Sequence, residues 1–243
     1  MWGKNANIYE HDGMKKSEQK NIRSLRVAIA SVDAVLFTVM DDGIYVFLVP
    51  IDRPPFYTNV HGLPGGVIGP HETAEESALK HLREKAHIKG VHIEQLYTFS
   101  EPDRDKRSRS ISIAYMALVS HDQLSSKARE TKGRWFPIEK LPKLAFDHAK
   151  IIHVGKNRLQ GKLAYTNIAS NLLPKQFTLT ELQKVYETIL ERTLDKRNFR
   201  KKMLSINLVK EAGGKKKTIH RPAELYAFTK KNLITIAEVK SVL

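Results

Sequence analysis

Cysteine is absent from the 243 residues of this chain. Its absence excludes disulfide bonds, thiolate catalysis and zinc sites built from thiolates. No run of about 18 apolar residues occurs either, which excludes a membrane-spanning helix and argues against a membrane partner. The first residues are polar and lack the apolar segment of a secretory signal, so we expect a cytoplasmic protein.

Acidic residues are scarce in the last third of the chain. Residues 1–150 carry 22 basic and 19 acidic side chains, a net charge of +3, whereas residues 151–243 carry 19 and 7, a net charge of +12. These two values account for the net charge of +15. The C-terminal part therefore has the positive field expected of a module that binds a polyanion such as nucleic acid.

One stretch, residues 65–88, has the spacing of a Nudix box. The box that Nudix hydrolases share is a glycine, five residues, a glutamate, seven residues, and then Arg-Glu-apolar-x-Glu-Glu-x-Gly-apolar. The matching positions in this chain are Gly66, Glu72, Leu82, Glu84 and Ile88. This resemblance to the Nudix box implies that the fold of that family is present.

The same box departs from the pattern at the positions that carry the catalytic and metal-binding side chains in the hydrolases. Lys80 replaces the arginine, His81 and Lys85 replace two glutamates, and His87 replaces the glycine. A cation such as magnesium needs oxygen ligands, and a charged lysine repels a cation placed next to it. We therefore predict no catalytic residue, no metal site and no cofactor.

The altered positions are expected on one face of a helix. His81, Glu84 and Lys85 are separated by three and four residues, a spacing that brings side chains together on a helix. Two interpretations of Lys85 remain open. It is either a solvated residue of a decayed site or a positive charge that holds a phosphate where the metal ion used to be.

Short β-rich runs alternate with loops through the rest of the first 150 residues. Strands are expected in four of these runs, at residues 27–37, 44–49, 95–99 and 111–119. Helices are expected after the capping-box pattern of Thr73 and Glu76 and near Asp147 and His148. The pattern predicts an α+β fold, in which residues 25–150 form a Nudix-like α/β/α sandwich domain behind an N-terminal arm at residues 1–24.

A different module is predicted after Pro174. Residues 151–172 have a helical pattern and are expected to connect the two parts. Within residues 173–243, Thr178 and Glu181 form a second capping box, and a short break leads from that helix to a basic amphipathic helix with Phe199 and Met203 on its apolar face.

A basic hairpin is expected to follow these two helices. Residues 208–222 predict two strands around a turn at Gly213 and Gly214, and residues 225–228 can complete the sheet. A helix, a short turn, a basic helix and a hairpin together make a winged helix-turn-helix domain.

Double-stranded DNA is the polyanion that such a module binds. In the basic helix we predict that five residues enter or border the major groove, namely Lys196, Arg197, Asn198, Arg200 and Lys201. In the hairpin we predict contacts with phosphates or the minor groove from Lys215, Lys216, Lys217 and Arg221. The alternative is a solvated helix face, but the apolar stripe on the same helix and the hairpin behind it favour DNA binding.

A Nudix-like domain followed by a basic winged helix resembles the NrtR family of bacterial transcriptional regulators. The resemblance covers about residues 25–230 and is strongest in four segments: the box, residues 97–105, residues 146–148 and residues 194–204. It implies a homodimer that represses genes of NAD metabolism. It also implies that ADP-ribose or a related nucleotide binds the Nudix-like domain and releases DNA.

Arginines in loops could bind the phosphates of such a ligand as bidentate forks, and an aromatic ring such as Phe56 or Phe99 could stack on its base. The candidate ligand-binding residues are Arg53, Gly65, Gly66, Lys85, Phe99, Arg104, Arg107 and Arg109.

Two other functions remain open. A residual pyrophosphohydrolase with a DNA-binding appendage would use Glu72 and Glu84, with Glu101 or Asp103 from a loop. Alternatively, the Nudix-like domain is only a dimerisation scaffold, and a partner protein sets the regulation.

Overall fold

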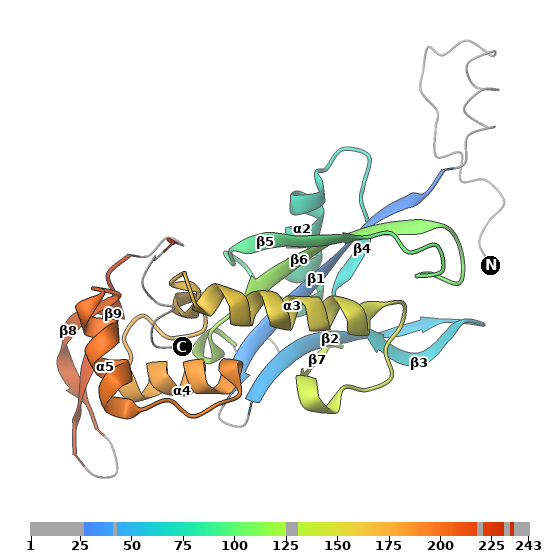
Figure 1. The fold of residues 1–243 in the computed structure, drawn as a ribbon. Helices are drawn as coiled ribbons and strands as arrows, with labels where there is room; N and C mark the ends of the chain where they lie inside the picture. Colours follow the sequence, from blue (N-terminus) through green and yellow to red (C-terminus); the bar gives the residue numbers. More distant parts are fainter. Residues whose placement is uncertain (1–26, 41–42, 125–130, 218–220, 231–233, 236–243) are drawn as a thin grey trace, which may run out of the picture.

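A computed structural model describes residues 27–40, 43–124, 131–217, 221–230 and 234–235. The predicted arm at residues 1–24 lies outside these described residues. A twisted sheet with helices on both sides occupies one end of the molecule, and two helices and a hairpin occupy the other (Figure 1). Among the described residues, no helix is long and apolar enough to cross a membrane.

Seven strands form the large sheet, and its central path has the order β3-β2-β1-β6-β5. The strands on this path are β1 (Ile29–Met40), β2 (Gly43–Arg53), β3 (Tyr57–Gly62), β5 (Ile93–Phe99) and β6 (Ser110–Leu118). β1 and β6 are parallel, and the other pairs are antiparallel. Two short strands lie off the path, β4 (Gly65–Val67) against β1 and β7 (Arg134–Pro137) against β2.

The two faces of the sheet are covered by different helices. Successive side chains of a strand point to opposite faces, so Val32 and Leu36 of β1 pack with Leu82 of α2 (Ala74–Ala86). Val35 and Phe37 lie in the core that contains α3 (His148–Leu163). This α/β/α arrangement agrees with the predicted fold. Single 3-10 turns connect the remaining segments, at η1 (His121–Gln123), η3 (Ile138–Lys140) and η4 (Ile168–Asn171).

Both predicted capping boxes are present. Thr73 accepts a hydrogen bond from the Glu76 amide while the Glu76 carboxylate accepts from the Thr73 amide, and this begins α2. At the other end of α2, His87 occupies the left-handed region with φ 54°. Glycine adopts this conformation at little cost, which explains why the Nudix pattern has glycine there. The histidine keeps the backbone geometry.

The C-terminal part contains α4 (Leu179–Leu190), α5 (Lys196–Ser205), β8 (Val209–Lys216) and β9 (Ala223–Phe228). Thr178 and Glu181 form the second capping box, and Asp195 caps α5 by accepting from the Asn198 amide. This is the predicted helix-turn-helix followed by a hairpin.

The predicted position of the hairpin turn was wrong. Gly213 and Gly214 lie inside β8, with φ of 76° and 82°, and the register of the β8–β9 pair shifts between Glu211 and Lys215. Glycine favours positive φ in a bulge as well as in a turn. The chain therefore turns later, between Lys216 and Ala223, and part of this turn lies outside the described residues.

One hydrophobic core continues from the sheet into the winged helix. It includes Phe37 of β1, Leu159 of α3, Tyr186 of α4 and Phe199 of α5, whose side chains are all fully buried. Figure 1 shows α3 lying across one face of the sheet, with α4 next to it on the side of α5 and the hairpin. A displacement of α3 is therefore expected to shift the helices of the winged helix, because close-packed cores transmit strain.

Candidate functional site

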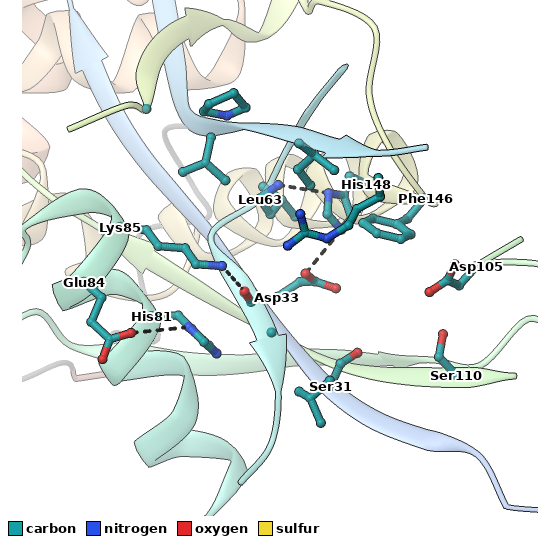
Figure 2. Close-up of a pocket in the computed structure, with 18 of the residues that line it drawn as sticks. Ser31, Asp33, Leu63, His81, Glu84, Lys85, Asp105, Ser110, Phe146 and His148 are labelled. Atoms are coloured by element: carbon teal, nitrogen blue, oxygen red, sulfur yellow. Dashed lines mark hydrogen bonds and ion pairs between the residues drawn. The ribbon is translucent and has the colours of Figure 1, made fainter. Parts of the chain in front are cut away.

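A large cavity opens beside the Nudix-box helix. Its volume is about 850 Å³, which lies in the range of about 300–1,000 Å³ that is typical of small-molecule sites. Its walls come from α2, from β1, β2 and β4, from the loop at residues 104–110 and from the start of α3. Figure 2 shows side chains from these elements pointing toward one another around it.

The altered face of the box lines this cavity. His81, Glu84 and Lys85 all belong to its wall, as the helical spacing predicted. The Lys85 ammonium donates a hydrogen bond to the Gly65 carbonyl oxygen of β4. Burial lowers the pKa of Lys85, and nearby Arg53 lowers it further, whereas Asp33 acts in the opposite direction. Lys85 is half-buried and forms no ion pair with a residue that the structure describes, so we expect its ammonium to be open to an anion.

His81 stands beside these cations in the wall of the cavity. Burial lowers the pKa of its imidazole, and the ammonium groups of Lys85 and Lys80 lower it further. Its ring packs against the backbone of Gly66, where a β-carbon would approach the ring to 2.5 Å. Glycine at this position of β4 leaves room for the ring.

Glu72 is engaged outside the cavity. Its carboxylate lies 2.6 Å from the Lys80 ammonium and accepts from the Gly69 amide at 2.8 Å. These bonds, the one to Lys80 first, lower the pKa of Glu72 to about 2. The pair ties the loop before α2 to the helix. Within the described ranges, no group of three or more His, Asp or Glu side chains is arranged to hold a metal ion.

A buried ion network forms the floor of the cavity. Arg104, whose side chain is 4% exposed, contacts Asp147 through two nitrogens at 2.7 and 3.2 Å and Asp33 at 3.3 Å. His148 lies 3.2 Å from Asp33 and accepts from the Leu63 amide at 2.9 Å. Burial alone would raise the pKa of Asp33, but His148, Ser112 and Arg104 together hold it below its usual value.

An aromatic shelf stands next to this floor. The Arg107 guanidinium lies 5.2 Å from the ring centre of Phe146 and 5.9 Å from that of Tyr57, within cation–π range. It also pairs with Asp105 at 2.8 Å. Phe146 has φ 54°, an uncommon conformation for a non-glycine residue. The strained residue directly precedes Asp147 and the first turn of α3.

The structure brings six of the eight candidate ligand residues to the cavity wall: Arg53, Gly65, Gly66, Lys85, Arg104 and Arg107. The other two lie elsewhere. Phe99 is 2% exposed and packs in the core on the α3 side of the sheet. Arg109 donates to the carbonyl oxygens of Ser100 and Glu101 and braces the loop.

Sequence reasoning missed three residues of this site: Asp33, Phe146 and His148. Asp33 had a detectable signal, since it is the one charged residue of a mostly apolar strand. Phe146 and His148 belong to a motif that was noted without a role.

A second surface is formed by α5 and the hairpin. Lys196, Arg197, Arg200 and Lys201 are exposed on α5, opposite the buried Phe199 and Met203. None of these four cations forms an ion pair with a residue that the structure describes. In the hairpin, Lys215 lies 3.0 Å from Glu224 and Lys216 lies 2.6 Å from Glu181. Lys217 and Arg221 follow in the turn, and both are exposed.

Family comparisons agree with this two-part geometry. Residues 30–154 match the NUDIX domain, and residues 169–228 match the NrtR DNA-binding winged helix domain. A protein of Acinetobacter baylyi, the ADPR responsive transcriptional repressor NtrR, is 32% identical over 205 residues, which are 82% of each chain. The chain belongs to the NrtR family. Membership confirms the predicted fold and the predicted DNA-binding transcriptional regulator.

Two solved structures of this family are similar to this chain, one to both of its parts and one to its Nudix domain. The Shewanella oneidensis NrtR complexed with a 27mer DNA is 34% identical and covers 82% of this chain and 93% of its own, with a TM-score of 0.75. The NUDIX domain of that protein complexed with ADP ribose is 32% identical and covers 60% of this chain and 99% of its own, with a TM-score of 0.50.

Proposed function

We propose that this chain represses transcription by binding an operator through its winged helix, and that a nucleotide such as ADP-ribose enters the cavity and releases the DNA. The repressed genes would be those of NAD metabolism. One observation carries the proposal: the cavity wall includes the first turn of α3, and α3 shares its core with α4 and α5. The relatives that respond to or bind ADP-ribose supply the nucleotide class.

The ligand's phosphates would lie between Lys85 and Arg53. Both side chains line the cavity, and Lys85 stands on the helix face where hydrolases of the box carry acidic metal ligands. A lysine ammonium binds phosphate as a point charge, so it replaces the neutralising effect of the metal ion. Binding would then need no divalent cation and would lead to no hydrolysis.

Release of DNA would start at the floor. An anion that approaches Arg104 competes with Asp147, which lies directly before α3. Weakening this pair changes the position of the α3 N-terminus, and the shared core carries the change to α4. Two recognition helices in a homodimer would then lose the spacing that a paired operator site requires. The factor by which the ligand lowers the operator affinity is set by how much more tightly the ligand binds the released conformation than the DNA-binding one.

The test is a mobility shift with ADP-ribose in the presence of a chelator. The wild type should release an operator fragment on adding ADP-ribose, and Lys85→Met should need at least about tenfold more, because a charged hydrogen bond contributes about 1.5–3 kcal/mol. Lys89→Met is the matched control, since Lys89 is an exposed cation just beyond α2 and outside the cavity. Equal responses of Lys85→Met and the wild type, or a strict need for magnesium, would disprove the role of Lys85.

One observation supports a second candidate, a residual pyrophosphohydrolase: Glu84, a box carboxylate, still faces the cavity. Magnesium-dependent release of AMP from ADP-ribose, lost in Glu84→Gln, is the outcome that would establish it. Unchanged regulation in a cavity mutant that no longer binds nucleotide would instead favour a Nudix-like domain that serves only as a dimerisation scaffold.

A further inference from the structure

An exposed leucine stands at the C-terminal end of the basic face of α5. Arg197, Lys201 and Leu204 are separated by four and three residues, so they follow one another along a single stripe of the helix. Phe199 and Met203 point the other way, into the core. Leu204 is 44% exposed, and of the large apolar side chains found exposed in the described chain it alone lies in the winged helix.

The position of Leu204 limits what it can contact. If α5 enters the major groove, the stripe that contains Arg197 and Lys201 faces the base edges, and Leu204 faces them too. The groove floor consists of hydrogen-bond donors and acceptors, except for the C5-methyl group of thymine. That methyl group is the apolar partner that DNA offers to a leucine.

We propose that Leu204 contacts a thymine methyl group and is a residue that determines the operator sequence. The inference rests on the proposed binding of DNA through α5. Helix geometry also gives the position of the thymine. A helix rises about 1.5 Å per residue, so Leu204 lies about 10 Å along α5 from Arg197. Base pairs are stacked about 3.4 Å apart, which places the thymine about three base pairs from the contact of Arg197.

A contact between two copies of the chain is the competing use of an exposed leucine. The surroundings of Leu204 disfavour it, because Arg200 and Lys201 flank the side chain and carry no ion-pair partner among the described residues. Two copies that met through this face would bring like charges together, which is repulsive. A duplex, with its negative phosphates, complements the same surface.

The experiment compares thymine with deoxyuridine, which lacks only the methyl group. A binding site is first selected from a random duplex pool with the full-length protein, and each thymine of that site is then replaced singly by deoxyuridine. For the wild type, one replacement in each half-site should weaken binding about fourfold, the factor that corresponds to about 0.8 kcal/mol for one buried methyl group. Leu204→Ala should bind both duplexes equally well.

Two control variants keep the result interpretable. Ser205→Ala changes the neighbouring exposed residue on the same helix and should retain the fourfold difference. Arg197→Ala should weaken binding to both duplexes and retain their ratio. Alanine is the best helix former, so none of these changes should disrupt α5, and thermal unfolding checks this directly.

The outcomes separate the inference from the proposed function. If no sequence is selected and no duplex is bound, DNA binding itself is disproved. If a site is selected but no deoxyuridine replacement matters, or if Leu204→Ala keeps the methyl preference of the wild type, the role of Leu204 is wrong. Conversion of a dimer to a monomer by Leu204→Ala would assign the side chain to an interface between copies.

Discussion

Two groups of cations in this protein differ in how they are partnered. In the cavity wall, Arg104 lies between two carboxylates and Arg107 pairs with a third. On α5, Lys196, Arg197, Arg200 and Lys201 form no ion pair with any described residue. The first group is fixed in place before a ligand arrives, whereas the second awaits an external anion.

The difference matches two kinds of recognition. A small nucleotide is bound by a few groups whose geometry must be set in advance, because ordering them on binding reduces affinity. A DNA backbone is bound by many exposed cations, which displace the counterions condensed on the DNA. The exact position of each cation before binding therefore matters less. If this contrast holds, losing a partnered buried cation should lower the stability of the fold, and losing an unpartnered cation of α5 should weaken DNA binding alone.

Removing the charge of Arg104 should destabilise the whole protein. Arg104→Met leaves Asp33 and Asp147 buried without their partner, and breaking a buried ion pair costs about 3–5 kcal/mol. For a chain of this size that corresponds to a decrease in Tm of about 10 °C. Thermal unfolding measures it. Lys150→Met is the control, because it breaks an exposed pair with Glu101 in the same domain and should shift Tm by no more than about 3 °C. Similar shifts for the two variants would contradict the contrast.

Acid should weaken the same network. The pKa of Asp33 is lowered in the fold, so its stabilising contribution is present above the unfolded value of about 3.9 and is lost as the pH falls through the folded value. The effect should be smaller than that of Arg104→Met, because a protonated carboxyl can still form hydrogen bonds. Urea unfolding between pH 7 and pH 3 measures it. Asp33→Asn should be less stable than the wild type at pH 7 but should lose less of its stability below pH 4. If the free energy of unfolding depends on pH in the same way in both proteins, the pKa of Asp33 is not lowered.

Removing one α5 cation should affect DNA binding without affecting the fold. Arg197→Ala should weaken binding by about 1–3 kcal/mol if Arg197 contacts a base, whereas a lost phosphate contact would lower the slope of log affinity against log salt by about 1. Thermal stability should be unchanged, because the side chain has no ion-pair partner in the described chain to lose. Titrations at several salt concentrations measure both quantities. Lys89→Ala, which removes a cation from the other domain, should change neither of them.

How much of this molecule the sequence predicts depends on how far apart along the chain the interacting residues lie. Spacing along the chain was sufficient for the capping boxes at Thr73 and Thr178, for the shared face of His81, Glu84 and Lys85, and for the apolar face of α5. Each is a local rule of helices. The family resemblance then allowed the function of the two parts to be predicted together.

The floor of the cavity was beyond such rules. Asp33, Arg104 and Asp147 meet because β1 and β6 pair in parallel with one register and the loop between β5 and β6 turns back over them. Neither the register nor the loop path is encoded by local spacing. The same limit explains Gly213 and Gly214, since two glycines are equally compatible with a turn and with a bulge, and only the pairing of β8 with β9 distinguishes them.

The cations of the hairpin are intermediate between the two groups in how they are partnered. Changing one of their partners should give the smallest change in DNA affinity. Lys215 and Glu224 form a pair at 3.0 Å, but both side chains are about half exposed, and such pairs contribute about 0–1 kcal/mol. A phosphate must compete with Glu224 for the lysine. Glu224→Gln should therefore tighten DNA binding by up to about fivefold, the factor that corresponds to 1 kcal/mol, without changing Tm.

The matched control for the hairpin is Glu211→Gln. Glu211 is an exposed carboxylate of β8 that forms no ion pair with a described residue, so its removal changes the net charge equally but frees no lysine. A larger gain in affinity for Glu224→Gln, measured in parallel titrations, would mean that Lys215 is held back by its partner. Equal gains would mean that only the total charge of the hairpin matters, and the distinction between partnered and free cations would then apply to buried groups alone.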